Sequence, residues 1–82
     1  MLATLTKGGI LYMKLMSPDQ VRQLYAVKKQ WFTIEEISKG MGMSTQTISK
    51  ALRGLPMRPK TVKEIAGSLD VPVTEIATFL KN

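Results

Sequence analysis

The sequence predicts an all-α protein, a compact five-helix bundle preceded by a short N-terminal strand or hairpin arm. Three observations lead to this fold class. Apolar residues recur at helical spacing through most of the chain, helix-start signals precede several of these segments, and short connections separate them. Because 82 residues hold one small domain, we divide the chain into an arm, residues 1–16, and a helical domain, residues 17–82.

The arm contains two β-prone runs, residues 2–6 and 10–15, on either side of Lys7-Gly8-Gly9. Glycines between such runs predict a hairpin or a loosely paired dimerisation strand. An isolated hairpin is marginal in water, so it would have to pack on the helices or pair with another copy. The alternative is a flexible arm or a start-codon-derived extension, with Met13 and Met16 as other possible starts, so whether residues 1–12 are native stays open.

The first helix is predicted over residues 18–29. Ser17 can cap it, Pro18 suits its first position and Gln20 stands where a capping box needs it. Its apolar stripe, which includes Val21 and Tyr25, is expected to join the core.

The second helix is predicted from Ile34 to about Met41. Thr33 and Glu36 form the pattern of a capping box at its start. Trp31, just before it, could stack on a base, but large aromatic side chains usually bury, and a core or partly buried packing role is favoured.

A tight turn is predicted between the second and third helices. Gly42 can adopt a positive φ, Ser44 caps the third helix, and the link is only about three residues long. So short a link makes the two helices cross steeply, and Ser38 is small where their backbones would approach. The third helix is expected from Thr45 to about Arg53.

Two further helices complete the bundle. Gly54 ends the third helix, and Pro56 and Pro59 keep the following segment from being helical. A fourth helix is predicted from Pro59. A fifth is predicted over residues 73–80, where its apolar side chains close the core.

Composition narrows the function classes. The chain has no cysteine and no histidine, so it lacks the usual zinc ligands and the commonest general base, and no enzyme, metal site, cofactor or small-molecule ligand is predicted. Lysine and arginine exceed aspartate and glutamate by six. Between residues 44 and 63 lie only basic charges, at Lys50, Arg53, Arg58, Lys60 and Lys63. Such a local excess favours a polyanionic partner.

The third helix has the composition of a DNA-reading helix. Its outward side chains are slim and none is acidic, as the major groove requires. Gln46 can pair with adenine and Lys50 with guanine or phosphate, while the hydroxyls of neighbouring residues can bond to base or phosphate. Base readout is predicted for Thr45, Gln46, Ser49 and Lys50. Phosphate contact is predicted for Ser44, Thr47 and Arg53. Ile48, Ala51 and Leu52 are expected to be buried.

These residues resemble the helix-turn-helix of the Cro/C1-type (lambda-repressor-like, XRE) DNA-binding domains. The resemblance rests on Ser38, Gly42, Met43, Ser44, Ile48, Ala51 and Gly54, and the helices around them match the family plan over roughly residues 18–80. It implies that Thr45, Gln46 and Lys50 read bases and that Thr33, Arg58 and Lys60 contact phosphates.

One position departs from the family. Many members carry glutamine at the start of the second helix, where it contacts phosphate and braces a glutamine of the third; this chain has Ile34. Residues 44–50, with Lys60-Thr61, also resemble the lac-repressor-type headpiece. Those proteins start with the motif, whereas here a whole helix precedes it and the chain stops at Asn82, which favours the Cro/C1 type.

The predicted function is a sequence-specific regulator that binds double-stranded DNA, a phage, plasmid or bacterial repressor acting as a homodimer on a palindromic operator. Activation instead of repression stays open, as do the operator sequence, the regulated gene and any inducer or anti-repressor partner. The alternative is a protein-binding antitoxin-like or anti-repressor module. The dimer surface is expected at the fifth helix (Thr78, Phe79, Lys81) or at the N-terminal arm. No apolar run approaches the ~20 residues of a membrane span, and no signal peptide is evident, so a cytoplasmic or nucleoid location is expected.

Overall fold

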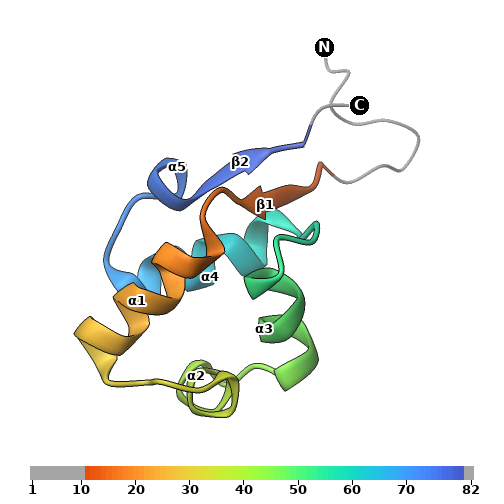
Figure 1. The fold of residues 1–82 in the computed structure, drawn as a ribbon. Coiled ribbons are helices and arrows are strands. Elements are labelled where there is room, and N and C mark those ends of the chain that lie inside the picture. The colour runs from red at the N-terminus through yellow and green to blue at the C-terminus, as the bar shows by residue number, and fades with distance from the viewer. Residues whose placement is uncertain (1–10, 81–82) are drawn as a thin grey trace.

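The protein is described by a computed structural model over residues 11–80, as five helices and a two-stranded sheet. The elements in chain order are β1 (Met13–Leu15), α1 (Pro18–Lys29), α2 (Ile34–Met41), α3 (Thr45–Leu52), α4 (Pro59–Leu69), α5 (Val73–Ile76) and β2 (Ala77–Phe79). The helical fold class and the strand before it are confirmed (Figure 1). The first run of the predicted hairpin, residues 2–6, lies outside the described residues.

The sheet joins the two ends of the described chain. β1 runs antiparallel to β2, with Met13 opposite Phe79 and Leu15 opposite Ala77. On its other side, Met13 exchanges two backbone hydrogen bonds with Met57, at 2.8 and 2.7 Å. The side chains of Met13 and Leu15 are buried, so β1 is part of the folded body and not a free arm.

The prediction of a fifth helix through residue 80 is wrong. α5 ends at Ile76, where the N–H of Ala77 donates to the carbonyl of Val73 and the backbone becomes extended. The next residues form β2 because β1 supplies a partner for their backbone groups. Apolar spacing at residues 76, 77, 79 and 80 fits either structure, and the strand that decides between them comes from the other end of the described chain.

The start of α1 corrects a second detail. Pro18 occupies the first turn as predicted, but Ser17 makes no side-chain capping bond. Ser17 has φ −138° and ψ 83°, whereas the working caps Thr33 and Ser44 have ψ of 160° and 153°. The predicted capping box at residues 17–20 is therefore wrong, because its backbone does not aim the hydroxyl at the helix N–H groups.

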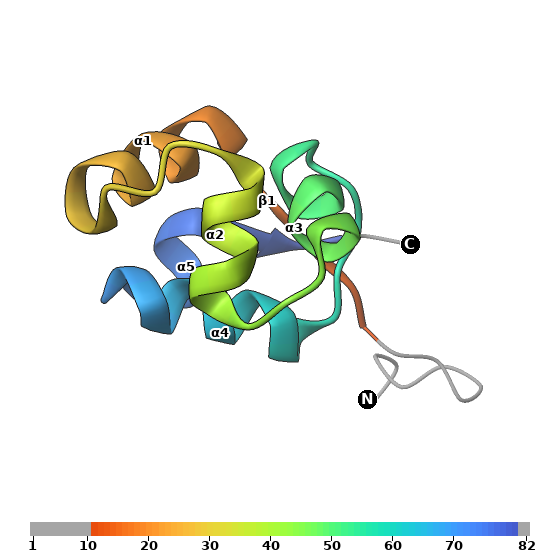
Figure 2. The ribbon, with the colours of Figure 1, turned by 90° about the horizontal axis from the view of Figure 1, so that it is seen from below.

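One core lies between the helices and the sheet. Figure 2 shows α1 along one side and α4 along the other, with α2 between them in the view. Every element contributes buried apolar side chains, including Leu15, Val21, Ile37, Ile48, Val62, Ile65, Leu69 and Ile76. Burial of these side chains provides the main driving force for folding.

A buried tyrosine links three helices. The hydroxyl of Tyr25 in α1 lies 2.8 Å from Ser68 Oγ in α4 and donates to the Met41 sulfur of α2 at 3.4 Å. Burial raises the pKa of Tyr25, and the hydrogen bond with Ser68 opposes that rise. Because a buried phenol loses its water partners, these contacts remove the penalty of an unsatisfied hydroxyl.

Trp31 packs against the protein, as predicted. Its ring stacks on Tyr25 with centroids 5.6 Å apart and planes inclined by 25°. The ammonium of Lys29 lies 5.9 Å from the Trp31 ring centroid. Trp31 is partly buried against the core, so it fixes the segment between α1 and α2.

Candidate nucleic-acid interface

The connection between α2 and α3 is a glycine turn. Gly42 has φ 72° and ψ 29°, the left-handed conformation that glycine adopts without a Cβ penalty. Its N–H donates to Lys39 O, and the N–H of Met43 donates to Ser38 O at 3.0 Å. These bonds satisfy the last carbonyls of α2 and turn the chain sharply into α3.

Ser38 lies where α2 meets the core. Its side chain is 3% exposed, and its hydroxyl has no hydrogen-bond partner among residues 11–80. Figure 1 shows α2 nearly end-on while α3 is seen from the side, so the two helices cross steeply. The small, buried Ser38 is consistent with the close approach predicted for this crossing.

Ser44 starts α3 as predicted. Its hydroxyl accepts a hydrogen bond from the N–H of Thr47 at 3.1 Å and lies 2.9 Å from Thr47 Oγ1. No partner within residues 11–80 takes the N–H groups of Thr45 and Gln46, because the first N–H groups of a helix have no intrahelical acceptor. Two backbone donors and two hydroxyls therefore gather at this helix end, and the helix dipole favours an anion there.

The two faces of α3 are separated as the sequence predicts. Ile48, Ala51 and Leu52 are buried. Four proposed readers lie on the other side: Thr45, Gln46 and Lys50 are exposed, and Ser49 is half-buried. The apolar side of α3 thus packs in the core, and a row of slim polar side chains stays at the surface.

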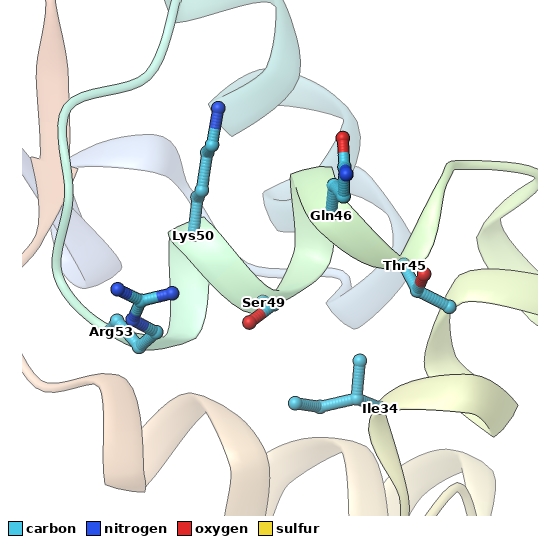
Figure 3. A pocket seen from close by; sticks show the side chains of 6 residues that line it. All are labelled: Ile34, Thr45, Gln46, Ser49, Lys50 and Arg53. Atoms are coloured by element: carbon cyan, nitrogen blue, oxygen red, sulfur yellow. The ribbon is translucent and has the colours of Figure 1, made fainter.

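The four proposed readers line one hollow, together with Ile34 and Arg53. An open depression of about 540 Å³ is bordered by Ile34, Thr45, Gln46, Ser49, Lys50 and Arg53. Figure 3 shows Gln46 and Lys50 extending to the same side of α3, with Ile34 facing the helix from the start of α2. The structure therefore brings all four predicted base readers to one surface.

The predicted phosphate-binding residues are spread more widely. Arg53 borders the hollow, whereas Arg58 precedes the first turn of α4 and Lys60 lies within it, both exposed and outside the hollow. Ser44 and Thr47 stand together at the start of α3. These residues therefore lie on different elements and do not form a single cluster.

The carboxylate of Glu36 competes with a DNA phosphate for the backbone N–H groups next to Thr33. The Thr33 hydroxyl accepts from the N–H of Glu36 at 3.0 Å, and the Glu36 carboxylate accepts from the N–H groups of Phe32 and Thr33 at 2.7 and 3.1 Å. The predicted capping box is confirmed. It also places a negative charge at the start of α2, so that, among the described residues there, the Thr33 hydroxyl proton and the N–H groups of Ile34 and Glu35 stay available to an anion.

Ile34 is the site residue whose part the sequence did not reveal. It stood out only as a departure from the family pattern, but the structure makes it a wall of the hollow. Its position directly after the capping residue Thr33 was the available signal, because the cap sets where the side chain of Ile34 starts.

Two negative findings apply to residues 11–80. None of the helices there has the length and apolar character needed to cross a membrane. The same residues include no group of three or more acidic, histidine or cysteine side chains placed to hold a metal ion.

Comparison with known proteins gives one match. A family model described as helix-turn-helix matches residues 25–76, more than half of the chain. The matched family, of the Cro/C1 type, consists of DNA-binding regulators of transcription. No curated protein and no solved structure matches the chain.

Proposed function

The chain belongs to the Cro/C1-type helix-turn-helix family, and from that premise we propose that it regulates transcription by reading a specific double-stranded DNA sequence with α3 in the major groove. The observation that carries the proposal is the two-sided character of α3. One side is locked in the core, and the other offers Thr45, Gln46 and Lys50 with no acidic or bulky group between them. A helix fits the groove when its outward side chains are of this kind.

In this arrangement the base edges are contacted by Thr45, Gln46, Ser49 and Lys50. Gln46 is suited to adenine, because an amide can donate and accept at once, and Lys50 is suited to guanine acceptors. The surrounding contacts go to phosphates and hold the protein in register. These are made by Thr33, Ser44, Thr47, Arg53, Arg58 and Lys60.

The protein acts as a homodimer on a near-palindromic operator. One α3 contacts few base pairs, and two copies related by a two-fold axis reach half-sites about one helical turn apart. Parts of the two dimer surfaces expected from sequence lie side by side, since β1 of the arm and β2 belong to one sheet and form one surface; residues 1–10 of the arm and Lys81 lie outside the described residues.

The outer edge of β2 is the part of that surface suited to pairing. The N–H of Leu80 donates to Tyr12 O and that of Met16 to Ile76 O, so by antiparallel alternation the N–H and C=O of Phe79 point away from β1. An edge of this kind is a template for another strand. Beside it lies an apolar hollow of about 310 Å³, and Phe79 is 51% exposed.

Occupation of the operator represses transcription by keeping polymerase from an overlapping promoter. The alternative is a protein-binding antitoxin-like or anti-repressor module, and the salt dependence of duplex binding distinguishes the two functions. Specific DNA binding weakens steeply as salt rises, because counterions are released from the phosphates.

The decisive experiment is selection from a pool of random duplexes. The expected result is a consensus with two related half-sites and an affinity that falls steeply with salt. A pool that yields no consensus rejects base reading by α3 and favours the protein-binding alternative. A reporter gene driven from a promoter that overlaps the selected site then separates repression from activation.

A further inference from the structure

Ile34 stands out chemically among the walls of the α3 hollow. Of the six described residues that border it, Ile34 alone is apolar. The Thr33–Glu36 capping box holds it at the first position of α2. Part of its side chain packs against the core, and the rest faces the hollow. An aliphatic surface is thus offered beside Thr45 and Ser49, in the hollow that Gln46 also borders (Figure 3).

Such a surface matches one group in the major groove. The edges of the bases carry polar donors and acceptors, and the apolar exception is the C5-methyl group of thymine. A phosphate gains nothing from the side chain of isoleucine, since that side chain has no hydrogen-bond donor. Contact between Ile34 and a thymine methyl removes two apolar surfaces from water, which is favourable.

We propose that Ile34 is a specificity-determining residue that recognises thymine through its C5-methyl group, next to the base edges contacted by α3. This inference rests on the proposed function. Ile34 thus adds an apolar reader to the polar readers of α3 and extends their readout by one position in each half-site.

The test replaces thymine by uracil, one position at a time, in the operator obtained by selection. Uracil keeps the base pair and all of its hydrogen-bonding groups and lacks only the methyl. Burial of one methyl-sized apolar group changes an equilibrium constant about four-fold. We expect one thymine per half-site at which uracil weakens binding of the unaltered protein by about that factor.

Three variants separate Ile34 from other causes. With Ile34→Ala, the same uracil substitution is expected to change affinity by less than about two-fold, because the side chain that met the methyl is gone. Ile34→Val should keep most of the uracil effect. Val27→Ala, on the exposed side of α1 where Val27 is 79% exposed, should keep all of it. Thermal unfolding followed by circular dichroism confirms that each variant is folded.

The outcomes are distinct. Uracil effects that are equal in the unaltered protein and in Ile34→Ala, or absent at every thymine, overturn the inference and leave the proposed function standing. If Ile34→Ala does not fold, Ile34→Thr takes its place, because it keeps the β-branched shape and replaces part of the apolar surface by a hydroxyl; an undiminished uracil effect in Ile34→Thr then overturns the inference. A failure to select any operator defeats the proposed function, and this inference with it.

Discussion

The ring of Trp31 lies against Gly40 so closely that a Cβ at residue 40 would overlap its six-membered ring. The absence of a side chain in the last turn of α2 thus allows Trp31 to stack on Tyr25 of α1. Glycine in a helix is unfavourable relative to alanine by about 1 kcal/mol. Here the glycine of α2 makes room for Trp31, which stacks on Tyr25 of α1 and so connects the two helices.

Gly40→Ala is therefore expected to destabilise the protein by about 1–2 kcal/mol. The helix gains about 1 kcal/mol of propensity, but Trp31 must swing away and loses both its stack and part of its burial, which together exceed that gain. Urea unfolding and the emission wavelength of the single tryptophan report both effects. Gly67→Ala in α4 is the matched control: open space surrounds it, and it should stabilise the fold by up to about 1 kcal/mol.

The raised pKa of Tyr25 predicts that the folded protein loses stability at alkaline pH. Because burial raises its pKa in the folded protein, the folded state favours the neutral phenol more than the unfolded chain does. The resulting stabilisation is fully present below about pH 10, the ordinary tyrosine pKa, and is lost as pH rises through the folded pKa. Urea unfolding of the unaltered protein and Tyr25→Phe between pH 8 and 11 should show their difference in stability shrinking above about pH 10. A constant difference contradicts the assignment.

Gln46→Ala is expected to relax the choice of base at one position of the operator. The loss on the preferred site should be on the order of 1–3 kcal/mol, with little loss on random DNA, because base contacts discriminate and phosphate contacts do not. Binding of both duplexes is measured at one salt concentration. Gln23→Ala, an exposed glutamine of α1, is the control and should bind like the unaltered protein.

Arg58→Ala should weaken binding to all duplexes alike. Arg58 precedes α4 and is proposed to neutralise one phosphate, so its removal lowers the slope of log affinity against log salt by about one unit. Titrations over a range of salt concentrations give that slope. Arg22→Ala removes the same charge from α1 and should leave the slope closer to that of the unaltered protein. If Arg58→Ala changes base preference instead, the assignment of readers and phosphate contacts is reversed.

Phe79→Arg is expected to weaken or abolish the dimer. It places a charge beside the edge of β2 that pairs with no other strand among residues 11–80, and in the apolar surface proposed to meet a second copy. Sedimentation equilibrium should show a monomer, and affinity for an operator with two half-sites should fall toward that for a single half-site. Val27→Arg is the control, because Val27 is 79% exposed on α1, away from the sheet. A dimer that survives Phe79→Arg places the interface elsewhere.

Much of the site could be predicted from sequence because its signals are local. The Thr33–Glu36 capping box, the positive φ of Gly42, the Ser44 cap and the split between buried Ile48 and exposed Gln46 each depend on residues a few positions apart. Helical periodicity and cap chemistry operate over this distance. The predicted roles of the exposed residues in DNA contact stay predictions.

The errors arose where a distant segment decided the outcome. Ser17 has the right identity for a cap, but it has ψ 83°, at the point where the chain leaves β1, and β1 is held by β2 from the other end of the described chain. Ile34 lines the hollow because of the way α2 crosses α3. The spacing of residues within either helix does not predict that crossing.

By itself the sequence determined four of the helices, the turn between α2 and α3 and the polar face of α3, since each follows from neighbouring residues. Tertiary structure decided the fate of residues 77–79, because a strand forms only where another strand satisfies its backbone groups, and that partner is β1. It also joined residues 13–15 of the N-terminal arm and residues 77–79 into one sheet. Finally, it placed Ile34 beside the readers, because only packing fixes which side chains of two helices share a surface.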